Sequence, residues 1–403
     1  MALIPVEEAL ARVLDGAQPL PPERIATAEA HGRVLTEDLA ARRTHPPADV
    51  SAMDGYAVRA ADVASAPARL RLIGEVAAGR VFSGTVGSGE AARILTGGVL
   101  PADADTIVIQ ENTRREGDTV IVESSSRAGR HVRRAGLDFR EGDVLLRKGR
   151  RLTVRDLAVA SAMNHPSIAV HRRPRVAVLS TGDELMLPGS ELAPGQIVSS
   201  NGPALAAMAR AEGAEALDLG IAPDRIDETT ASIRRARDWG ADVLLTTGGA
   251  SVGDYDLVQA VLAAEGMDLA FWKVALRPGK PLIHGKLGTT RVLGLPGNPV
   301  SAFVCAFLFM VPLVRRLAGR PDVEPAIAQG RLGRDLPEND ERQDYLRSTL
   351  HRDANGTVVA TPLDVQDSSM MTGLAKADGL VIRAPFAAAA RAGDECTILP
   401  LGL

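Results

Sequence analysis

Cysteine and aromatic residues are scarce in this chain of 403 residues. Two cysteines occur, and aromatic residues make up only 3% of the sequence. Cys305 and Cys396 lie far apart in apolar surroundings, without CxxC spacing or a disulfide framework, so we expect two buried thiols. The sequence also has no Ser/His/Asp, Cys/His or zinc-ligand arrangement, which leaves covalent hydrolysis and zinc chemistry with little support.

The marks of a secreted, membrane or nucleic-acid-binding protein are also lacking. The N-terminal residues 1–5 contain no basic stretch leading into an apolar run, and we expect no segment to reach the roughly 18 apolar residues that span a bilayer. The formal net charge of −4 argues against nucleic acid as the main partner. Arginines concentrate between residues 127 and 155 without interleaved aromatics, which favours a solvated basic surface over an RNA site. We therefore expect a cytoplasmic protein.

What is present is the composition of a folded protein with several domains. Hydrophobic residues make up 45% and charged residues 24% of the chain. Domains usually span about 100 to 200 residues, so two to four domains are expected. Helical spacing of apolar residues appears at 6–14, and short runs such as 106–110 and 119–123 then predict a small β-rich domain.

Strands alternate with helices in the second half of the chain. Short apolar runs at 175–180, 243–247 and 292–295 are each followed by glycine-rich sequence and then by helical spacing. This alternation predicts an αβ domain with a mainly parallel sheet, ending near Arg320. Asn201 is expected to cap the first of its helices, which cover 203–212, 227–239, 257–265 and 300–317. After Pro321, strand-length runs at 345–350, 357–361, 379–382 and 396–399 predict a small β-barrel or sandwich.

Ligands of an open parallel sheet bind at the carboxyl ends of its strands. The loops expected there are 181–184, 248–256 and 296–299. Glycine lets the backbone approach a phosphate closely, so the segment 248–253 is a candidate anion cradle. A purely structural tight turn explains the same glycines equally well.

Acidic residues lie in two of these loops. Asp183 and Glu184 stand in the first, and Asp254 and Asp256 in the second. Carboxylates beside a phosphate are typical of magnesium binding, which predicts a shared Mg²⁺ site. Helix capping is an equally good interpretation for one or two of them, and the better one for Asp256, which directly precedes a helix.

Three cations and two turns complete the candidates. Lys273, Arg277 and Lys280 lie in an irregular stretch where they could meet an oxyanion or phosphate, although surface lysines are more often solvated. Asp54 precedes a glycine, and 96–98 is Thr-Gly-Gly. From the residues alone, both are better interpreted as ordinary turns.

Seven strings of sequence are specific enough to be compared with known families. They are SAMDGYAVR (51–59), ILTGGVLPADADTIVIQEN (94–112), RRAGLDFREGD (133–143), STGDEL (180–185), TTGGASVGDYD (246–256), RPGKP (277–281) and LPGNPVSAF (295–303). In this order, and over nearly the whole chain, they resemble the MoeA family, which also includes the E domain of gephyrin.

The resemblance implies an α/β multidomain fold of four parts. A three-layer αβ molybdopterin-binding domain with a mainly parallel sheet is accompanied by small β-rich domains, including a C-terminal β-barrel. The implied boundaries are 1–45 with 145–172 for an elongated linking region, 46–144 for an inserted β-rich domain, 173–320 for the αβ domain and 321–403 for the barrel. The N-terminal helix is a candidate for packing on the αβ domain.

The resemblance also implies an activity. Adenylylated molybdopterin and molybdate would be the substrates, the metal would be inserted at the dithiolene, and the AMP linkage would be hydrolysed with Mg²⁺. The implied assembly is a homodimer with a cleft across its two subunits, in transient contact with an adenylyltransferase or with apo-molybdoenzymes. No nucleic acid and no membrane is implied.

Site residues carry over by motif. Acidic and hydroxyl functional positions are Asp54, Thr96, Asp138, Glu184, Asp224 and Asp256. The implied Mg²⁺ ligands among them are Glu184, Asp224 and Asp256. Substrate-binding positions are Thr181, Gly182, Asp183, Gly248, Gly249, Ser251, Gly253, Lys273, Arg277, Lys280, Pro296, Gly297, Asn298, Pro299, Arg347 and Ser368. The last two resemble residues that reach the cleft of the neighbouring subunit.

Some positions depart from the family pattern, and other functions stay open. Arg277 stands where lysine is frequent, Gly98 where alanine is expected, and Asp378 where asparagine often precedes Gly379. One alternative is an adenylyltransferase that acts through the αβ domain, against which the extra β domains argue. The other is a non-catalytic pterin-binding scaffold, for which the sequence specifies no partner groove. Molybdate and tungstate are not separated by the sequence.

Overall fold

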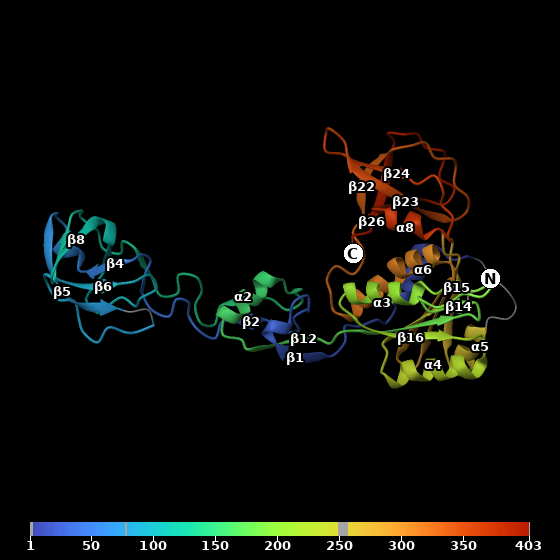
Figure 1. Ribbon diagram of the computed structural model, residues 1–403, viewed down its shortest axis with the longest axis horizontal. Helices are drawn as coiled ribbons and strands as arrows, with labels where there is room; N and C mark the ends of the chain where they lie inside the picture. Colours follow the sequence, from blue (N-terminus) through green and yellow to red (C-terminus); the bar gives the residue numbers. More distant parts are fainter. Residues whose placement is uncertain (1–2, 77–78, 249–256, 403) are drawn as a thin grey trace.

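The computed structural model describes residues 3–76, 79–248 and 257–402. Figure 1 shows an extended molecule whose β-rich part, with β4, β5, β6 and β8, forms one end. The αβ domain and the C-terminal β domain lie together at the other end, beside the N-terminus. A narrow region containing α2, β1 and β12 joins the two ends, so residues at opposite ends of one chain cannot meet.

The αβ domain is built on a six-stranded sheet of order β16-β13-β17-β21-β20-β18. The first four strands are parallel: β16 (Glu215–Ala222), β13 (Arg175–Thr181), β17 (Val243–Thr247) and β21 (Thr290–Leu295). β20 (Pro281–Leu287) and β18 (Asp268–Lys273) add an antiparallel edge. The expectation of a mainly parallel sheet is confirmed. The strands β16, β18 and β20 were not predicted, because their sequences lack a continuous apolar run or are not followed by a helical pattern.

Helices cover both faces of this sheet, which makes three layers. Residues alternate along β13, so Val176 and Val178 join one core while Ala177 and Leu179 join the other. The first core includes residues of α3 (Asn201–Ala211) and of α1 (Val6–Leu14), and the second those of α4 (Ile226–Asp238) and α5 (Leu257–Ala264). The N-terminal helix thus packs on the αβ domain, through Val6, Ala9 and Val13 among others.

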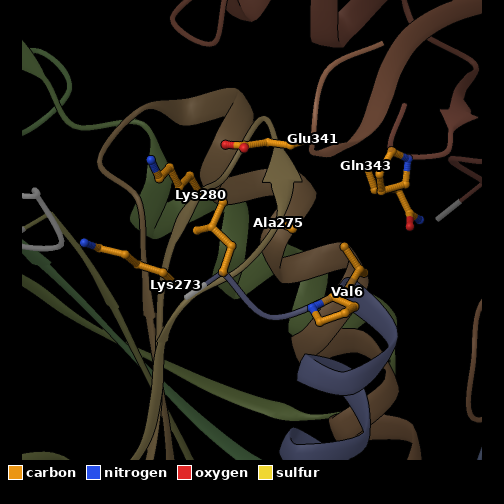
Figure 2. A pocket seen from close by; sticks show the side chains of 9 residues that line it. Val6, Lys273, Ala275, Lys280, Glu341 and Gln343 are labelled. Carbon is orange, nitrogen blue, oxygen red and sulfur yellow. The ribbon is translucent and has the colours of Figure 1, made fainter. Parts of the chain in front are cut away.

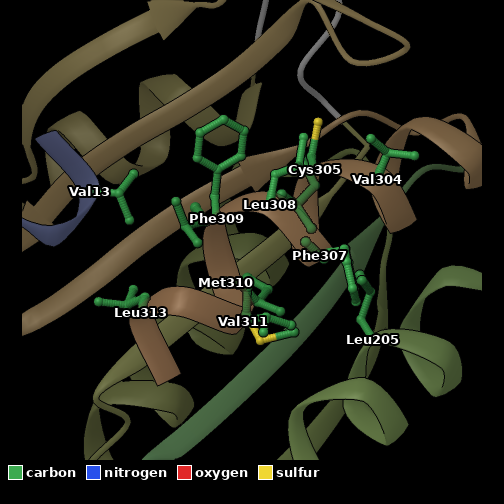
Figure 3. Packing of buried hydrophobic residues seen from close by; sticks show 14 of the residues in the cluster. Val13, Leu205, Val304, Cys305, Phe307, Leu308, Phe309, Met310, Val311 and Leu313 are labelled. Atoms are coloured by element: carbon green, nitrogen blue, oxygen red, sulfur yellow. The ribbon is translucent and has the colours of Figure 1, made fainter. Parts of the chain in front are cut away.

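The longest helical stretch runs through the first of these cores. It consists of α6 (Pro299–Cys305), the π-helical η4 (Ala306–Met310) and α7 (Val311–Leu317). With 19 residues and a hydropathy of 1.8, it is long and apolar enough to cross a membrane, so the expectation that no segment reaches that length is wrong. However, 78% of the window is buried inside the protein. Figure 3 shows its side chains packed against α1 and α3, as expected of a core helix.

The C-terminal domain is a closed five-stranded barrel. Its strands are β22 (Ala328–Leu332), β23 (Gln343–Arg352), β24 (Val358–Pro362), β25 (Gly379–Arg383) and β26 (Glu395–Pro400). The order β23-β24-β22-β26-β25 is closed by an additional pairing of β23 with β25. A short helix, α8 (Met371–Lys376), follows the loop after β24.

Most of the remaining strands belong to the other end of the molecule and its connection. The β-rich sheet has the order β7-β4-β6-β5-β9-β8, formed by Thr106–Ile109, Gly55–Val58, Glu90–Ile94, Ala68–Val76, Thr119–Val122 and Thr113–Glu116. The connecting region contains the pairs β1 (Pro22–Ala26) with β12 (Ser167–His171) and β2 (Leu39–Ala40) with β11 (Val144–Leu146). Helix α2 (Val154–Ala162) begins with a capping box between Thr153 and Asp156.

Candidate active site

A cleft opens where the parallel strands of the αβ sheet end. β13, β17 and β21 deliver Thr181, Thr247 and Pro296 to its wall, and the pocket there has a volume of about 710 Å³. Its remaining wall is formed by 184–185, 197–201, Gly248, 280–281, 297–299, Ser369 and Met371. The first and third loops expected from the sequence, together with Gly248 at the start of the second, therefore meet at one edge of the sheet, as the rule for open αβ sheets requires.

Two glycines allow the loops to approach one another. Gly248 has a φ of +90°, and a Cβ atom there would lie 2.2 Å from the carbonyl oxygen of Thr181. Gly182 has a φ of +149°, and its Cβ would lie 2.5 Å from a carboxylate oxygen of Glu184. At Gly248 the backbone conformation and the Thr181 carbonyl both exclude a side chain, so only glycine fits there. At Gly182 the positive φ favours glycine, and a Cβ would require the Glu184 side chain to move.

The loop after β21 is tied to the first part of the domain and to the barrel. The Asn201 side-chain amide donates to the carbonyl of Gly297 at 2.8 Å, so Asn201 is not the helix cap that we expected. Asn298 donates to the Ser368 hydroxyl at 3.0 Å, and the Val300 N–H donates to the Ser368 carbonyl at 3.1 Å. The barrel of the same chain thereby closes one side of the cleft.

Arg347 is buried on the outer face of the barrel, beneath the segment 365–370 and α8. It is 1% exposed, and its guanidinium donates to the carbonyls of Asp367 at 2.8 Å and Met370 at 2.9 Å. The expectation that Arg347 reaches a neighbouring cleft is therefore not what the structure shows. Instead, Arg347 anchors the loop that places Ser368 against Asn298 of its own subunit.

Carboxylates gather beside the cleft at the ends of β13 and β16. The Asp224 N–H donates to Asp183 at 3.0 Å, and Glu184 lines the pocket. Burial raises the pKa of Asp224 above its usual range, and the neighbouring charges of Asp183 and Glu184 raise it further. Such mutual repulsion is what a divalent cation would relieve, so these donors fit Mg²⁺. In the described ranges, no three acidic, histidine or cysteine residues already form a metal cluster.

The raised pKa of Asp224 predicts how Mg²⁺ should act on stability. The fold favours the protonated form of Asp224, so without metal this residue's contribution to the free energy of unfolding should rise as pH falls through the raised pKa towards the usual 3.8. Bound Mg²⁺ favours the ionised form. Thermal unfolding should therefore show stabilisation by Mg²⁺ at neutral pH that fades on acidification.

Two variants check this expectation. Asp224→Asn should remove this residue's contribution to the pH dependence and most of the Mg²⁺ effect. Asp227→Asn, which changes an exposed carboxylate paired with Arg225, should leave both in place. Equal Mg²⁺ stabilisation of wild type and Asp224→Asn would show that this carboxylate is not a ligand.

A second pocket, of about 610 Å³, adjoins the cleft and carries two lysines. Lys273 and Lys280 line it together with Glu341 and Gln343 of the barrel side. Figure 2 shows both ammonium groups extending to the same side of this pocket. Lys280 also lines the cleft, and in the part of the chain that the structure describes neither lysine forms an ion pair with a carboxylate.

Arg277 is placed differently from these lysines. It forms ion pairs with Asp340, at 3.0 Å, and with Asp344, and it donates to Asn339 at 2.9 Å. The side-chain hydrogen bond to Asp344 is the main cause that raises the pKa of Arg277 above its usual value. The structure therefore does not present Arg277 as a free cation for an oxyanion.

Other expected residues lie far from the cleft or outside the described residues. Asp54 accepts hydrogen bonds from the Thr96 N–H at 2.7 Å and the Thr96 hydroxyl at 2.8 Å, so these two are brought together. Asp138 is exposed, and its N–H donates to the His45 carbonyl. Asp54 and Thr96 adjoin β4 and β6 at the end of the molecule opposite the cleft (Figure 1). Asp138 instead precedes Phe139, whose side chain packs in the core of the connecting region. The expected positions that fall outside the described residues are Gly249, Ser251, Gly253, Asp254 and Asp256.

Sequence reasoning missed several residues of the cleft wall. Ile197 and Val198 belong to β15, which pairs with β14 (Leu185–Met186) beside the acidic loop. Ser369 and Met371 come from the barrel. No short-range pattern marks these four, although two exposed β-branched residues at 197–198 are a weak signal of a functional surface.

Comparison with known proteins covers the whole chain. Residues 4–164 match the model of the MoeA N-terminal region (domain I and II), 177–316 a probable molybdopterin binding domain, and 329–401 the MoeA C-terminal region (domain IV). This chain belongs to the MoeA family.

Individual relatives agree with this membership. A molybdopterin molybdenumtransferase of Bacillus subtilis is 34% identical over 387 residues, which cover 94% of this chain and 90% of the relative. One from Haemophilus influenzae is 32% identical and covers 99% and 98%. A crystal structure of the molybdopterin biosynthesis MoeA protein from Pyrococcus horikosii has a TM-score of 0.85 at 32% identity, covering 100% of both chains.

The departures from the MoeA pattern have local structural consequences. A Cβ at Gly98 would lie 2.9 Å from the Leu95 carbonyl oxygen, so an alanine would require the turn to shift. Asp378 accepts the N–H of Leu350 at 2.9 Å and holds the start of β25 beside β23. Arg277 has a fork of donors that a lysine lacks, and it uses that fork on three acceptors.

Proposed function

We propose that this protein is a molybdopterin molybdenumtransferase, which inserts molybdate into adenylylated molybdopterin and releases AMP by Mg²⁺-dependent hydrolysis. The enzyme class follows from relatives that share one name. Two of them match nearly the full length of the chain. The observation that carries the proposal is the cleft at the carboxyl ends of β13, β17 and β21, which combines glycine-lined backbone, carboxylates and lysines.

Each side of the cleft has a role in the proposal. Backbone near Thr181, Gly182 and Gly248 approaches the phosphate of the substrate, and the segment 296–299 holds the pterin. Lys273 and Lys280 attract molybdate into the adjoining pocket by charge.

Glu184 and Asp224 would hold Mg²⁺, with Asp256 as a third expected ligand outside the described residues. When bound, the metal neutralises charge on the phosphate. The protein's own carboxylates would orient the attacking water or the molybdate oxygen.

The remaining functional positions lead us to propose a homodimer. Asp54 and Thr96 lie at the end of the molecule opposite the cleft, and Asp138 adjoins the connecting region (Figure 1). If they act on the same substrate, they must reach the cleft of a second copy of the chain. A symmetric dimer with two shared sites is the simplest assembly that satisfies this condition.

The alternatives proposed from the sequence are not favoured. A bare adenylyltransferase needs only the αβ domain, whereas this chain matches the family in its N-terminal and C-terminal regions as well. A scaffold would have no need of the paired carboxylates beside the cleft. A cytoplasmic location, and transient contact with an adenylyltransferase or apo-molybdoenzymes, belong to the same proposal.

The decisive experiment supplies purified protein with adenylylated molybdopterin, Mg²⁺ and molybdate. AMP release is followed together with activation of an apo-molybdoenzyme. We expect AMP release that depends on molybdate. Binding of the pterin without AMP release would contradict the proposal and leave the scaffold.

A further inference from the structure

The loop that presents Lys280 belongs to two domains at once. It connects β18 and β20 of the αβ sheet, and the Val274 N–H closes its neck by donating to the Lys280 carbonyl at 3.1 Å. Between these points, β19 (Leu276–Arg277) leaves the αβ sheet and pairs in parallel with β23 of the barrel. The position of this loop therefore depends on the barrel as well as on its own domain.

The side chain of Arg277 strengthens this attachment. Its two terminal nitrogens donate to Asp340 at 3.0 Å, to Asn339 at 2.9 Å and to Asp344. All three acceptors belong to the barrel domain, and two of them are carboxylates. A planar fork bound on both sides holds the backbone that carries it in one orientation.

Asp344 is the buried member of this group. Its side chain is 5% exposed, whereas that of Arg277 is 42% exposed. The second carboxylate oxygen of Asp344 is buried and has no hydrogen-bond partner among the described residues. Burial raises the pKa of Asp344, although the bond from Arg277 opposes this.

Such a pair is a poor device for stability. The cost of burying a carboxylate is repaid only when its remaining lone pairs are satisfied, and here one oxygen is not. What the pair does provide is direction. It fixes Arg277 against β23, three residues before Lys280 in the RPGKP turn.

Packing of Gly279 against Cys305 also restricts the position of the turn. The Gly279 φ is +123°, and a Cβ there would lie 2.4 Å from the sulfur of buried Cys305. The Cys305 thiol donates to the Gly279 carbonyl at 3.6 Å. Because Arg277 is held by the barrel and Gly279 by its contact with Cys305, the backbone at Lys280 has little freedom to move.

We infer that Asp344 is a positioning residue for molybdate: through Arg277, it holds the turn that presents Lys280 to both pockets. The inference rests on the proposed function and adds to it a residue outside the cleft. Lys280 lines the 710 Å³ cleft and the 610 Å³ pocket, so a shift of the turn changes the place where the oxyanion is received.

The direction in which Asp344→Asn changes the KM for molybdate tests the inference. Asp344→Asn keeps the shape but removes the charge that opposes Arg277. If Asp344 positions the turn, the KM for molybdate should rise about tenfold while kcat changes by less than about twofold. If Arg277 is instead an oxyanion receptor masked by Asp344, unmasking it should lower the KM. A lower or unchanged KM would overturn the inference.

Further variants separate positioning from a loss of folding. Arg277→Lys keeps the charge but cannot span three acceptors, and should also raise the KM for molybdate. In the double variant Arg277→Gln with Asp344→Asn, an amide pair replaces the ion pair, so the KM should return towards that of wild type. Glu338→Gln is the matched control, since it changes an exposed carboxylate of the same barrel loop that makes no described contact with Arg277.

Direct titration of molybdate by calorimetry applies the same test without catalysis. Weaker molybdate binding by Asp344→Asn and Arg277→Lys, with unchanged thermal unfolding, supports the inference even if wild type releases no AMP. In that event the proposed function fails and the positioning role stands. If Asp344→Asn does not fold, Arg277→Lys decides, and wild-type molybdate affinity in that variant overturns the inference.

Discussion

Replacing Asp54 by asparagine is expected to lower molybdate-dependent AMP release by about 100-fold or more. The Asp54 carboxylate accepts the Thr96 N–H at 2.7 Å and the Thr96 hydroxyl at 2.8 Å. These bonds, the backbone one first, lower the pKa of Asp54 below its usual range, so the carboxyl is ionised at neutral pH. Asparagine keeps the accepting oxygen and removes only the charge. Steady-state kcat for AMP release is the measurement.

A matched carboxylate in the same sheet region serves as the control. Asp62 also accepts a backbone N–H, from Gly89 at 3.1 Å, and a hydroxyl, from Ser88 at 3.1 Å. Asp62→Asn should therefore have the same structural cost without the catalytic one. If both variants keep wild-type kcat, the Asp54 charge has no part in the reaction.

Mixing two inactive variants tests whether the site is shared between subunits. Asp54→Asn changes one end of the molecule, and Lys280→Ala changes the cleft at the other (Figure 1). When subunits reassort at random, half of the dimers are mixed, and each mixed dimer contains one intact shared site. Activity should therefore recover to about a quarter of that of wild type. A mixture that stays inactive would indicate a site confined to one subunit.

Replacing Gly248 by alanine is the second change with a large expected effect. The Gly248 φ of +90° disfavours any side chain, and the added Cβ would lie 2.2 Å from the Thr181 carbonyl oxygen. We expect the free energy of unfolding of the αβ domain to fall by about 3 kcal/mol. AMP release should be lost as well, because relieving the clash moves two walls of the cleft apart.

Urea unfolding followed by tryptophan fluorescence measures this loss. Both tryptophans of the chain, Trp239 and Trp272, lie in the αβ domain, so the signal reports on that domain. Gly297→Ala is the stability control, because a Cβ there would lie 3.7 Å from the Gly248 Cα, which is an ordinary contact. Its cost should stay below about 1 kcal/mol. Equal stability of the two variants would mean that the Gly248 loop yields without strain.

The sequence by itself determined the elements whose signal is local. Apolar runs followed by glycine predicted β13, β17 and β21, and helical spacing predicted α1, α3, α4 and α5. Because parallel strands end at the same edge, these runs also predicted that the segments 181–184 and 296–299 would meet. Strings of family-specific residues also identified the MoeA family, since a motif is itself a local pattern.

Only the tertiary structure decided how distant side chains pair. From the sequence, Arg277 was a candidate cation for an oxyanion or phosphate, but the folded chain places it against Asp344 of the barrel. Arg347 was expected to reach the cleft of a neighbouring subunit, yet it is buried and binds the carbonyls of a loop in its own chain. The apolar helix at 299–317 has the composition of a membrane span but lies in the core. In each case the partner is far away in sequence, and no local periodicity encodes which distant surface will cover a residue.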